Sequence, residues 1–295
     1  MPHSGYMSAH TDTRHLLRRP WLFFALALGW FWLLWIPVVL AGASQLAFPG
    51  FILCALGGLG PPAAAILLLY RVHQPQDRRD YWRRVVDFRR IGLAWYGLIV
   101  LLPLAWNILG ILTGVLFGAP VPSFERAAEL LSDPLYIVPF AAVVLLFGPL
   151  PEELGWRGYA LDGLLARHSA LVASLILGVI WALWHWPQYF MEDSYIAGAF
   201  PIGSAIFWAG WVLPTITYSV LYTWIYNHTG RSILSAILFH FSTNFWGEVL
   251  AVRGEMVLYR SIWIVVLVIV IVIVWGPETL RRLSGPRMPI PRPPR

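Results

Sequence analysis

Long apolar stretches dominate this chain, and short polar segments separate them. From Trp21 onward the stretches are about 20 residues long, and a helix of that length spans a bilayer because each residue adds about 1.5 Å of rise. The expected fold class is therefore all-α, a polytopic bundle of about eight transmembrane helices. The pattern predicts these helices near residues 21–42, 50–71, 92–118, 135–160, 169–190, 203–227, 231–251 and 259–277.

The same pattern divides the chain into four parts. Residues 1–20 form a cytoplasmic N-terminal tail, 21–134 carry the N-terminal transmembrane helices, and 135–277 form a core that holds the candidate chemistry. Residues 278–295 are rich in Pro and Arg and are expected to be a disordered cytoplasmic tail. The first apolar run is longer than the apolar core of about 7–15 residues in a signal peptide, so we interpret it as an uncleaved helix.

Composition supports the membrane class. Hydrophobic residues make up 58% of the chain and charged residues only 12%, which is too few charges to cover a soluble domain. The single cysteine, Cys54, excludes an intramolecular disulfide and any multi-cysteine metal site, and we interpret it as a small buried residue.

The charges between the helices predict the orientation in the membrane. If both tails and the even-numbered connections are cytoplasmic, all but three of the 21 Arg residues lie inside. The exceptions are Arg126, Arg253 and Arg260. The positive-inside rule therefore favours an even number of helices with both termini in the cytoplasm. Because this topology explains the net charge of +6, no nucleic-acid partner is expected.

The connection from Asp77 to Ile91 is expected to be partly helical. It places Tyr81, Trp82, Val85 and Val86 on one side of a helix, with Arg residues around them. Such a helix can lie in the membrane interface beside anionic lipid. An ordinary topogenic loop explains the same composition, and both interpretations stay open.

Ionisable residues inside membrane helices are costly, so their presence requires a reason. On a helix, Glu153 and Arg157 are four residues apart and share a face, which favours an ion pair. Glu152 points about 100° away and has no such partner. A free carboxylate in an apolar pocket can take a proton from water as a general base. The alternative is that this cluster only ties helices together at the interface.

Two further segments bring polar residues into the membrane. His240 and Asn244 are four residues apart on one face and can both donate to an oxyanion, although polar pairs also pack helices together. Trp181 lies one turn before His185 and can buttress its imidazole, although a lone His between two Trp is also typical of the interface. Zinc, serine and aspartyl motifs of other intramembrane hydrolases are absent from the sequence.

These three segments resemble the signature of the CPBP intramembrane endopeptidases. That family includes the type II CAAX prenyl endopeptidases and the bacterial bacteriocin-processing or immunity proteins, also called the Abi family. The resemblance covers roughly residues 145–250. Trp181 departs from it, because the family usually has Phe there. The matching motifs are Glu152-Glu153-x-x-x-Arg157, Trp181-x-x-x-His185 and His240-x-x-x-Asn244.

The resemblance implies hydrolysis of a peptide bond within the membrane, with a membrane-associated or lipidated peptide or protein as substrate and the lipid bilayer as surroundings. The implied location is a bacterial plasma membrane. By analogy, Glu152 activates water, His185 positions or polarises it, and His240 and Asn244 hold the oxyanion. Glu153, Arg157 and Trp181 are then supporting residues.

We expect no cofactor in this site. The alternative is zinc, which Glu152, His185 and His240 have the right donor atoms to bind. The rival to an enzyme is a non-enzymatic immunity or scaffold protein that keeps the protease fold, and a transporter is a weaker third possibility.

One geometric problem follows from the helix assignment. Counted along their helices, Glu152 and His185 differ in depth by about 10 Å or more. A break at Pro149 or Pro151, an extension over residues 158–170, or strong tilt would close this gap. If the three motifs lie far apart in the structure, the catalytic interpretation is wrong.

Overall fold

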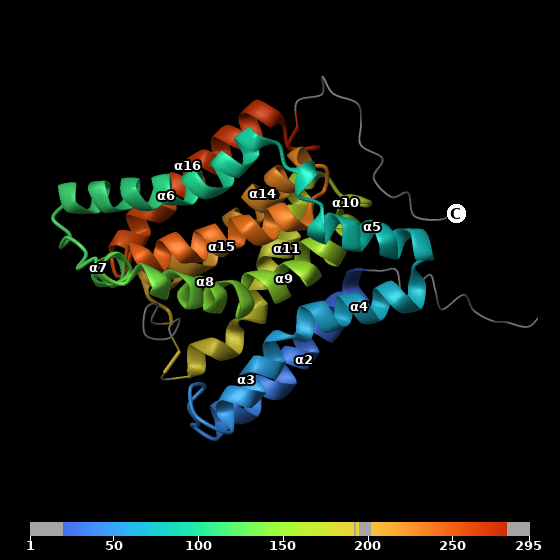
Figure 1. The fold of residues 1–295 in the computed structure, drawn as a ribbon, viewed down its shortest axis with the longest axis horizontal. Coiled ribbons are helices and arrows are strands. Elements are labelled where there is room, and N and C mark those ends of the chain that lie inside the picture. The colour runs from blue at the N-terminus through green and yellow to red at the C-terminus, as the bar shows by residue number, and fades with distance from the viewer. Residues whose placement is uncertain (1–19, 192, 195–201, 282–295) are drawn as a thin grey trace, which may run out of the picture.

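The computed structural model describes residues 20–191, 193, 194 and 202–281, and every regular element within them is helical. The predicted all-α class is therefore confirmed. The long helices run roughly along the longest axis of the molecule (Figure 1). The predicted tail at 1–20 lies outside the described residues except for Pro20, and the predicted tail at 278–295 does so after Arg281.

The helices follow one another with short connections. In chain order they are α2 (Pro20–Leu40), α3 (Gly50–Gly58), α4 (Gly60–Val72), α5 (Pro75–Val86), α6 (Leu93–Leu116), α7 (Glu125–Ser132), α8 (Ile137–Leu146), α9 (Pro149–Gly155), α10 (Leu161–Leu165), α11 (Ala170–Trp184), α13 (Ala205–Phe207), α14 (Leu213–His228), α15 (Ile233–Val249) and α16 (Met256–Trp275). The π-helical segments are Trp156–Ala160 and Trp208–Val212, and the 3-10 turns are Phe88–Arg90, Pro134–Tyr136 and Trp186–Phe190.

All eight predicted ranges contain helix, although not all are single spans. Among the described residues, five helical runs are long and apolar enough to cross a membrane: α2, α6, Pro134–Leu165, Ala170–Phe190 and α16. The pair α3 and α4 adds a sixth, bent by 42°. The remaining two predicted helices correspond to α14 and α15, which are 16 and 17 residues long.

The breaks that the apolar pattern did not predict occur at Gly and Pro. The expected helix 50–71 is interrupted at Leu59, because Pro61 and Pro62 follow and cannot donate backbone hydrogen bonds to the preceding turn. The expected helix 135–160 is interrupted at Gly148, whose backbone has φ −162° and ψ −82°, and it restarts at Pro149. It then continues beyond the predicted end to Leu165.

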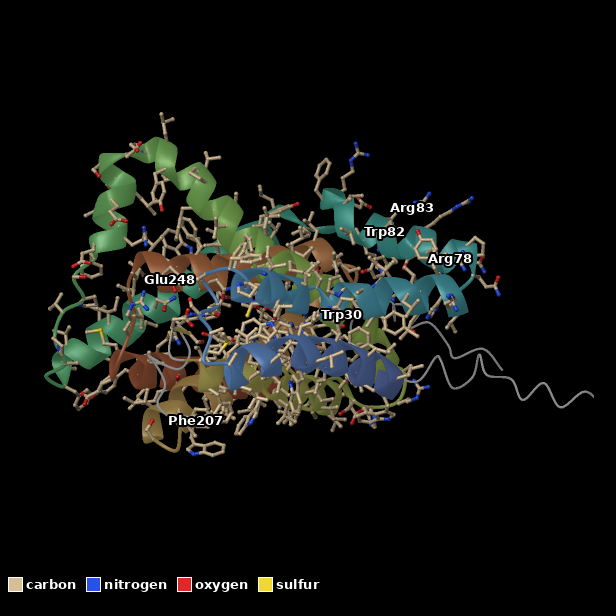
Figure 2. All side chains as sticks on the ribbon, turned by 90° about the horizontal axis from the view of Figure 1, so that it is seen from below. Trp30, Arg78, Trp82, Arg83, Phe207 and Glu248 are labelled. Carbon is tan, nitrogen blue, oxygen red and sulfur yellow. The ribbon has the colours of Figure 1, made fainter. Side chains whose placement is uncertain are left out.

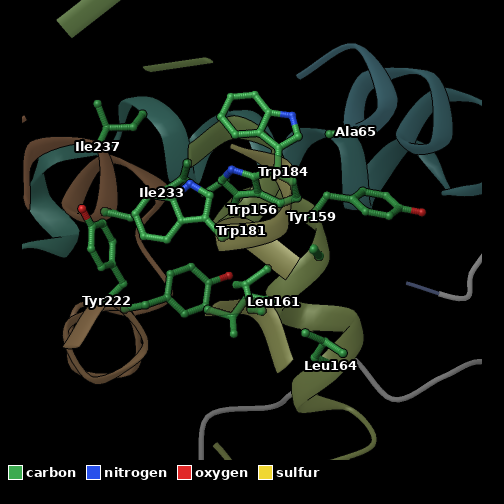
Figure 3. Close-up of a cluster of buried hydrophobic side chains, with 14 of the residues drawn as sticks. Ala65, Trp156, Tyr159, Leu161, Leu164, Trp181, Trp184, Tyr222, Ile233 and Ile237 are labelled. Carbon is green, nitrogen blue, oxygen red and sulfur yellow. The ribbon is translucent and has the colours of Figure 1, made fainter. Parts of the chain in front are cut away.

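Close helix approaches assemble the core. The helix α9 packs against α4 and α15, and α11 packs against α14. A Cβ on Gly155 would lie 2.4 Å from Cβ of Pro61, and one on Gly178 would lie 2.8 Å from Cα of Ile216. Only glycine permits these two approaches, as in other membrane bundles. Aromatic rings fill the space between the helices, including Trp156 and Trp184 (Figure 3).

The two ends of the bundle differ in charge. The helices α5 and α10 lie at one end and α7 lies at the other (Figure 1). The α5 end carries most of the described Arg residues, whereas the α7 end carries Glu125, Glu129 and Asp133. Pro20 lies beside Gly163 of α10, and the backbone carbonyl of Glu278 accepts a hydrogen bond from the Ala170 amide, so both described termini lie at the α5 end. That this end is cytoplasmic stays a prediction.

Candidate active site

The two adjacent glutamates of α9 have different partners. Glu153 is fully buried, and its Oε1 accepts hydrogen bonds from Nη1 of Arg157 at 2.7 Å and from Nδ1 of His240 at 2.9 Å. The predicted ion pair between Glu153 and Arg157 is therefore present. Glu152 does not share it and accepts instead from Nε1 of Trp181, at 2.6 Å from its Oε2.

Arg157 lies between aromatic rings. Its guanidinium carbon is 3.9 Å from the ring centroid of Tyr222 and 4.7 Å from that of Trp181. Such cation–π contacts stabilise a desolvated guanidinium, and the Glu153 carboxylate supplies the opposite charge. Arg157 belongs to the π-helical segment that follows α9, a kind of helix distortion that is frequent at functional sites.

The free oxygen of Glu152 faces Asn244 across Gly148. A Cβ built on Gly148 would lie 3.7 Å from Oε1 of Glu152 and 3.6 Å from Nδ2 of Asn244. The absence of a side chain at Gly148 therefore keeps a small space between the carboxylate and the amide. No described residue forms a hydrogen bond with the Asn244 side chain, so its amide remains able to donate.

His185 lies at the C-terminal end of α11 and forms a hydrogen bond with Trp181, one turn earlier. Its Nδ1 is 2.9 Å from the backbone carbonyl oxygen of Trp181. Because a carbonyl only accepts, Nδ1 carries the proton and Nε2 is the nitrogen that can face a substrate. The ring lies against those of Trp184 and Trp211, with centroids 4.7 and 5.4 Å away.

The structure brings the three predicted motifs together. Trp181 bonds to Glu152 through its indole and to His185 through its carbonyl, and its ring centroid is 5.4 Å from that of His240. The helix breaks at Gly148, directly before Pro149, which was one of the two prolines expected at a break. It also extends to Leu165, over part of the expected extension 158–170, and α9 lies beside α15.

Sequence reasoning missed two residues of this cluster. Tyr222 packs against Arg157 and is edge-on to His240, with ring centroids 5.7 Å apart. Its signal was the spacing Tyr218, Tyr222 and Tyr226, which repeats every four residues along an apolar helix. The role of Gly148 was missed because its backbone conformation cannot be read from the sequence.

A cavity of about 450 Å³ leads to Glu152. It lies between α2 and α3 on one side and α8 and α9 on the other. Most of its wall is apolar, and Glu152 supplies the only acidic side chain among the described lining residues. The other lining residues include Phe31, Trp35, Phe51, Cys54, Leu56, Leu146, Gly148 and Gln188.

Zinc is the alternative cofactor, and its expected ligands are Glu152, His185 and His240. Within the described residues, no three His, Cys, Asp or Glu side chains form a group that could hold a metal ion. Both candidate histidines also use Nδ1 for contacts with protein groups. Nε2 of each histidine is thus the atom that a metal would bind, and zinc as the alternative cofactor stays a prediction.

Comparisons with known proteins identify relatives of this chain. The family model described as type II CAAX prenyl endopeptidase Rce1-like matches residues 134–246, which include all three motifs. Over 208 residues the chain is 31% identical to CAAX prenyl protease 2 of Methanococcus maripaludis. The alignment covers 70% of this chain and 75% of that protein. These likenesses agree with the resemblance that the motifs indicated.

Proposed function

Since the chain belongs to the type II CAAX prenyl endopeptidase family, we propose that it hydrolyses a peptide bond with a water molecule activated by Glu152. The proposed substrate is a membrane-associated or lipidated peptide or protein, and the proposed location is a bacterial plasma membrane. The main support for this mechanism is that Glu152 and Glu153 have different partners. Arg157 forms its ion pair with Glu153, so Oε1 of Glu152 is available to bind water.

In the proposed reaction, Glu152 takes a proton from water while the water oxygen attacks the carbonyl carbon of the scissile bond. The electron pair of the C=O bond moves to the oxygen and forms an oxyanion. When this tetrahedral intermediate collapses, the C–N bond breaks and the leaving nitrogen receives the proton from Glu152. General bases in such positions typically contribute about 10²–10⁴-fold to the rate.

Asn244 and His240 are the proposed oxyanion donors. The Nδ2 of Asn244 lies beside the space at Gly148, near Glu152, and no described residue occupies its hydrogen bonds. Glu153 engages Nδ1 of His240, so an imidazolium at this position would donate from Nε2. His185 presents Nε2 as an acceptor, which supports a role in positioning the attacking water.

We propose that the reaction needs no metal. The arrangement of the described His, Cys, Asp and Glu side chains supports this proposal, because no three of them form a group that could hold a metal ion. The cavity supports a lipidated substrate, because a mostly apolar wall favours a hydrocarbon group next to the carboxylate.

The test is peptide cleavage by the purified protein in detergent, with a library of lipidated and leader-type peptides. Wild type is compared with Glu152→Ala and His240→Ala, each with and without a chelator, and Glu255→Ala at the exposed start of α16 serves as a matched control. We expect cleavage by wild type and the control, its loss in both site variants, and no effect of the chelator. Chelator-sensitive cleavage would contradict the metal-free mechanism, and cleavage by Glu152→Ala would contradict the role of this carboxylate.

A further inference from the structure

The outer face of α5 and the 3-10 turn Phe88–Arg90 after it carry basic side chains without acidic partners. Arg79, Arg83 and Arg89 are exposed, and none of them forms an ion pair with a described residue. The nearby carboxylates have other partners. Asp80 pairs with Arg84 and Arg90, and Asp87 pairs with Arg90. Asp77 accepts a hydrogen bond from the Gln74 amide and pairs with His73. The segment therefore presents an uncompensated positive surface at one end of a membrane bundle.

Apolar side chains lie among these arginines. Trp82 is 37% exposed, Val86 is 68% exposed and Phe88 is 61% exposed. Figure 2 shows Trp82 and Arg83 on the outside of α5. Of the four residues expected on one side of this helix, Trp82 and Val86 are exposed and Val85 is half-buried, whereas Tyr81 is buried. An exposed mixture of Arg, Trp and Phe beside membrane-spanning helices matches the boundary between headgroups and acyl chains.

The inner face of α5 contacts the helical run 149–165, which we call the glutamate helix. The hydroxyl of Tyr81 donates to the backbone carbonyl of Leu154 at 2.7 Å. Burial raises the pKa of this hydroxyl, so it keeps its proton and remains a donor. Leu154 directly follows Glu153, and the π-helical segment begins two residues later.

Arg84 makes the second contact, on the other side of the π-helical segment. Its side chain is 5% exposed, and its Nη1 lies 3.1 Å from Oδ2 of Asp162 and 2.5 Å from the hydroxyl of Tyr226. The Tyr226 hydroxyl donates to Asp162 at 2.8 Å, and Arg231 also pairs with Asp162. A buried charge network of this kind is costly to break once formed, because each partner would be left desolvated.

The two contacts bracket the part of the chain that holds the site together. Leu154 and Asp162 lie on either side of Arg157, which bonds to Glu153, and Glu153 in turn bonds to His240. A displacement of α5 would therefore move the backbone that sets the position of Arg157.

We propose that α5 and the turn after it bind anionic phospholipid headgroups of their own bilayer through Arg79, Arg83 and Arg89. This binding positions the glutamate helix through Tyr81 and Arg84. Positive residues near a membrane surface are attracted to anionic lipid, and the apolar side chains between them insert at the same depth. Tyr81 and Arg84 are positioning residues in this arrangement. The effect on catalysis rests on the proposed function, whereas the lipid contact and its transmission do not.

Lipid binding is tested with an environment-sensitive dye on α5. The variant Cys54→Ser/Val86→Cys carries the dye and is placed in nanodiscs of phosphatidylcholine alone or with phosphatidylglycerol added. We expect a blue-shifted emission in the anionic discs and loss of this shift in Arg79→Gln/Arg83→Gln. The control Arg126→Gln/Arg253→Gln removes two charges at the opposite end and should keep the shift. The same emission maximum in both kinds of disc would overturn the proposal. Loss of the shift in the Arg126→Gln/Arg253→Gln control would overturn it as well.

Transmission to the site is tested by hydrogen exchange of the amides of residues 153–165 in the same discs. For wild type, we expect slower exchange in anionic discs than in neutral ones. For Tyr81→Phe, which removes only the hydroxyl, we expect a smaller difference between the two kinds of disc. Equal exchange rates of wild type in neutral and anionic discs would overturn the positioning role. If peptide cleavage is found, Arg79→Gln/Arg83→Gln should lower it by roughly fivefold in anionic discs only. If no cleavage is found, the proposed function fails, and the dye and exchange results still decide this proposal.

Discussion

Trp181 donates its indole N–H to Glu152 at 2.6 Å, and the bonded oxygen is the one that does not face Gly148. The indole thus fixes the orientation of the carboxyl group, so that the other oxygen points into the space beside Asn244. The backbone carbonyl of the same residue holds His185. One aromatic residue therefore orients two of the proposed catalytic groups, although its expected role was only to support the histidine.

Replacing Trp181 with Phe should lower kcat without unfolding the protein. Phe keeps an aromatic ring beside Arg157 but leaves Oε2 of Glu152 without its donor. A hydrogen bond to a charged group contributes about 1.5–3 kcal/mol, which corresponds to at least a tenfold loss of rate. Trp224→Phe is the matched control, because the buried Trp224 indole N–H has no hydrogen-bond partner among the described residues. Equal rates for Trp181→Phe and this control would show that the indole bond has no catalytic role.

Gly148→Ala should fold and lose activity. The added Cβ would make ordinary contacts of 3.6 and 3.7 Å with Asn244 and Glu152, so no clash with these neighbours is expected. It would nevertheless occupy the space in which water and the scissile carbonyl must meet, and a misplacement of about 1 Å can cost 10²-fold in rate. Gly97→Ala is the control, since nothing lies within 4 Å of a Cβ at that position. Full activity of Gly148→Ala in the peptide assay would place the reaction elsewhere.

The orientation in the membrane can be tested with single cysteines. In a Cys54→Ser background, Arg83→Cys on α5 and Glu248→Cys in the last turn of α15 lie at opposite ends of the bundle (Figure 2). A membrane-impermeant thiol reagent added outside intact cells should label Glu248→Cys only, and permeabilisation should expose Arg83→Cys. Labelling of Arg83→Cys from outside would reverse the predicted topology.

The sequence was most informative about residues that are close along the chain. Spacing of four residues correctly predicted the pair Glu153 and Arg157, because both lie on one face of a helix. It also predicted that Glu152 would lack this partner. The apolar runs located the helices for the same reason, since length and hydropathy are local properties.

Contacts between helices could not be predicted in this way. The bond between Trp181 and Glu152 depends on how α11 packs against the glutamate helix, and the position of Tyr222 depends on α14. The break at Gly148 is a backbone conformation that Gly-Pro permits but does not require. The burial of Tyr81 could not be predicted either, because its hydroxyl donates to the Leu154 carbonyl and this contact depends on how α5 packs against the glutamate helix.

The two adjacent glutamates have different roles in the proposed mechanism, and paired variants test this difference most directly. Peptide cleavage and thermal unfolding in detergent are measured for Glu152→Gln and Glu153→Gln. Glu152→Gln should lose about 10²–10⁴-fold in kcat while its unfolding temperature stays near that of wild type. Glu153→Gln should be destabilised by about 3–5 kcal/mol, because it leaves Arg157 buried without a counter-charge. Near-wild-type cleavage by Glu152→Gln would contradict the account, whatever the stability of the two variants.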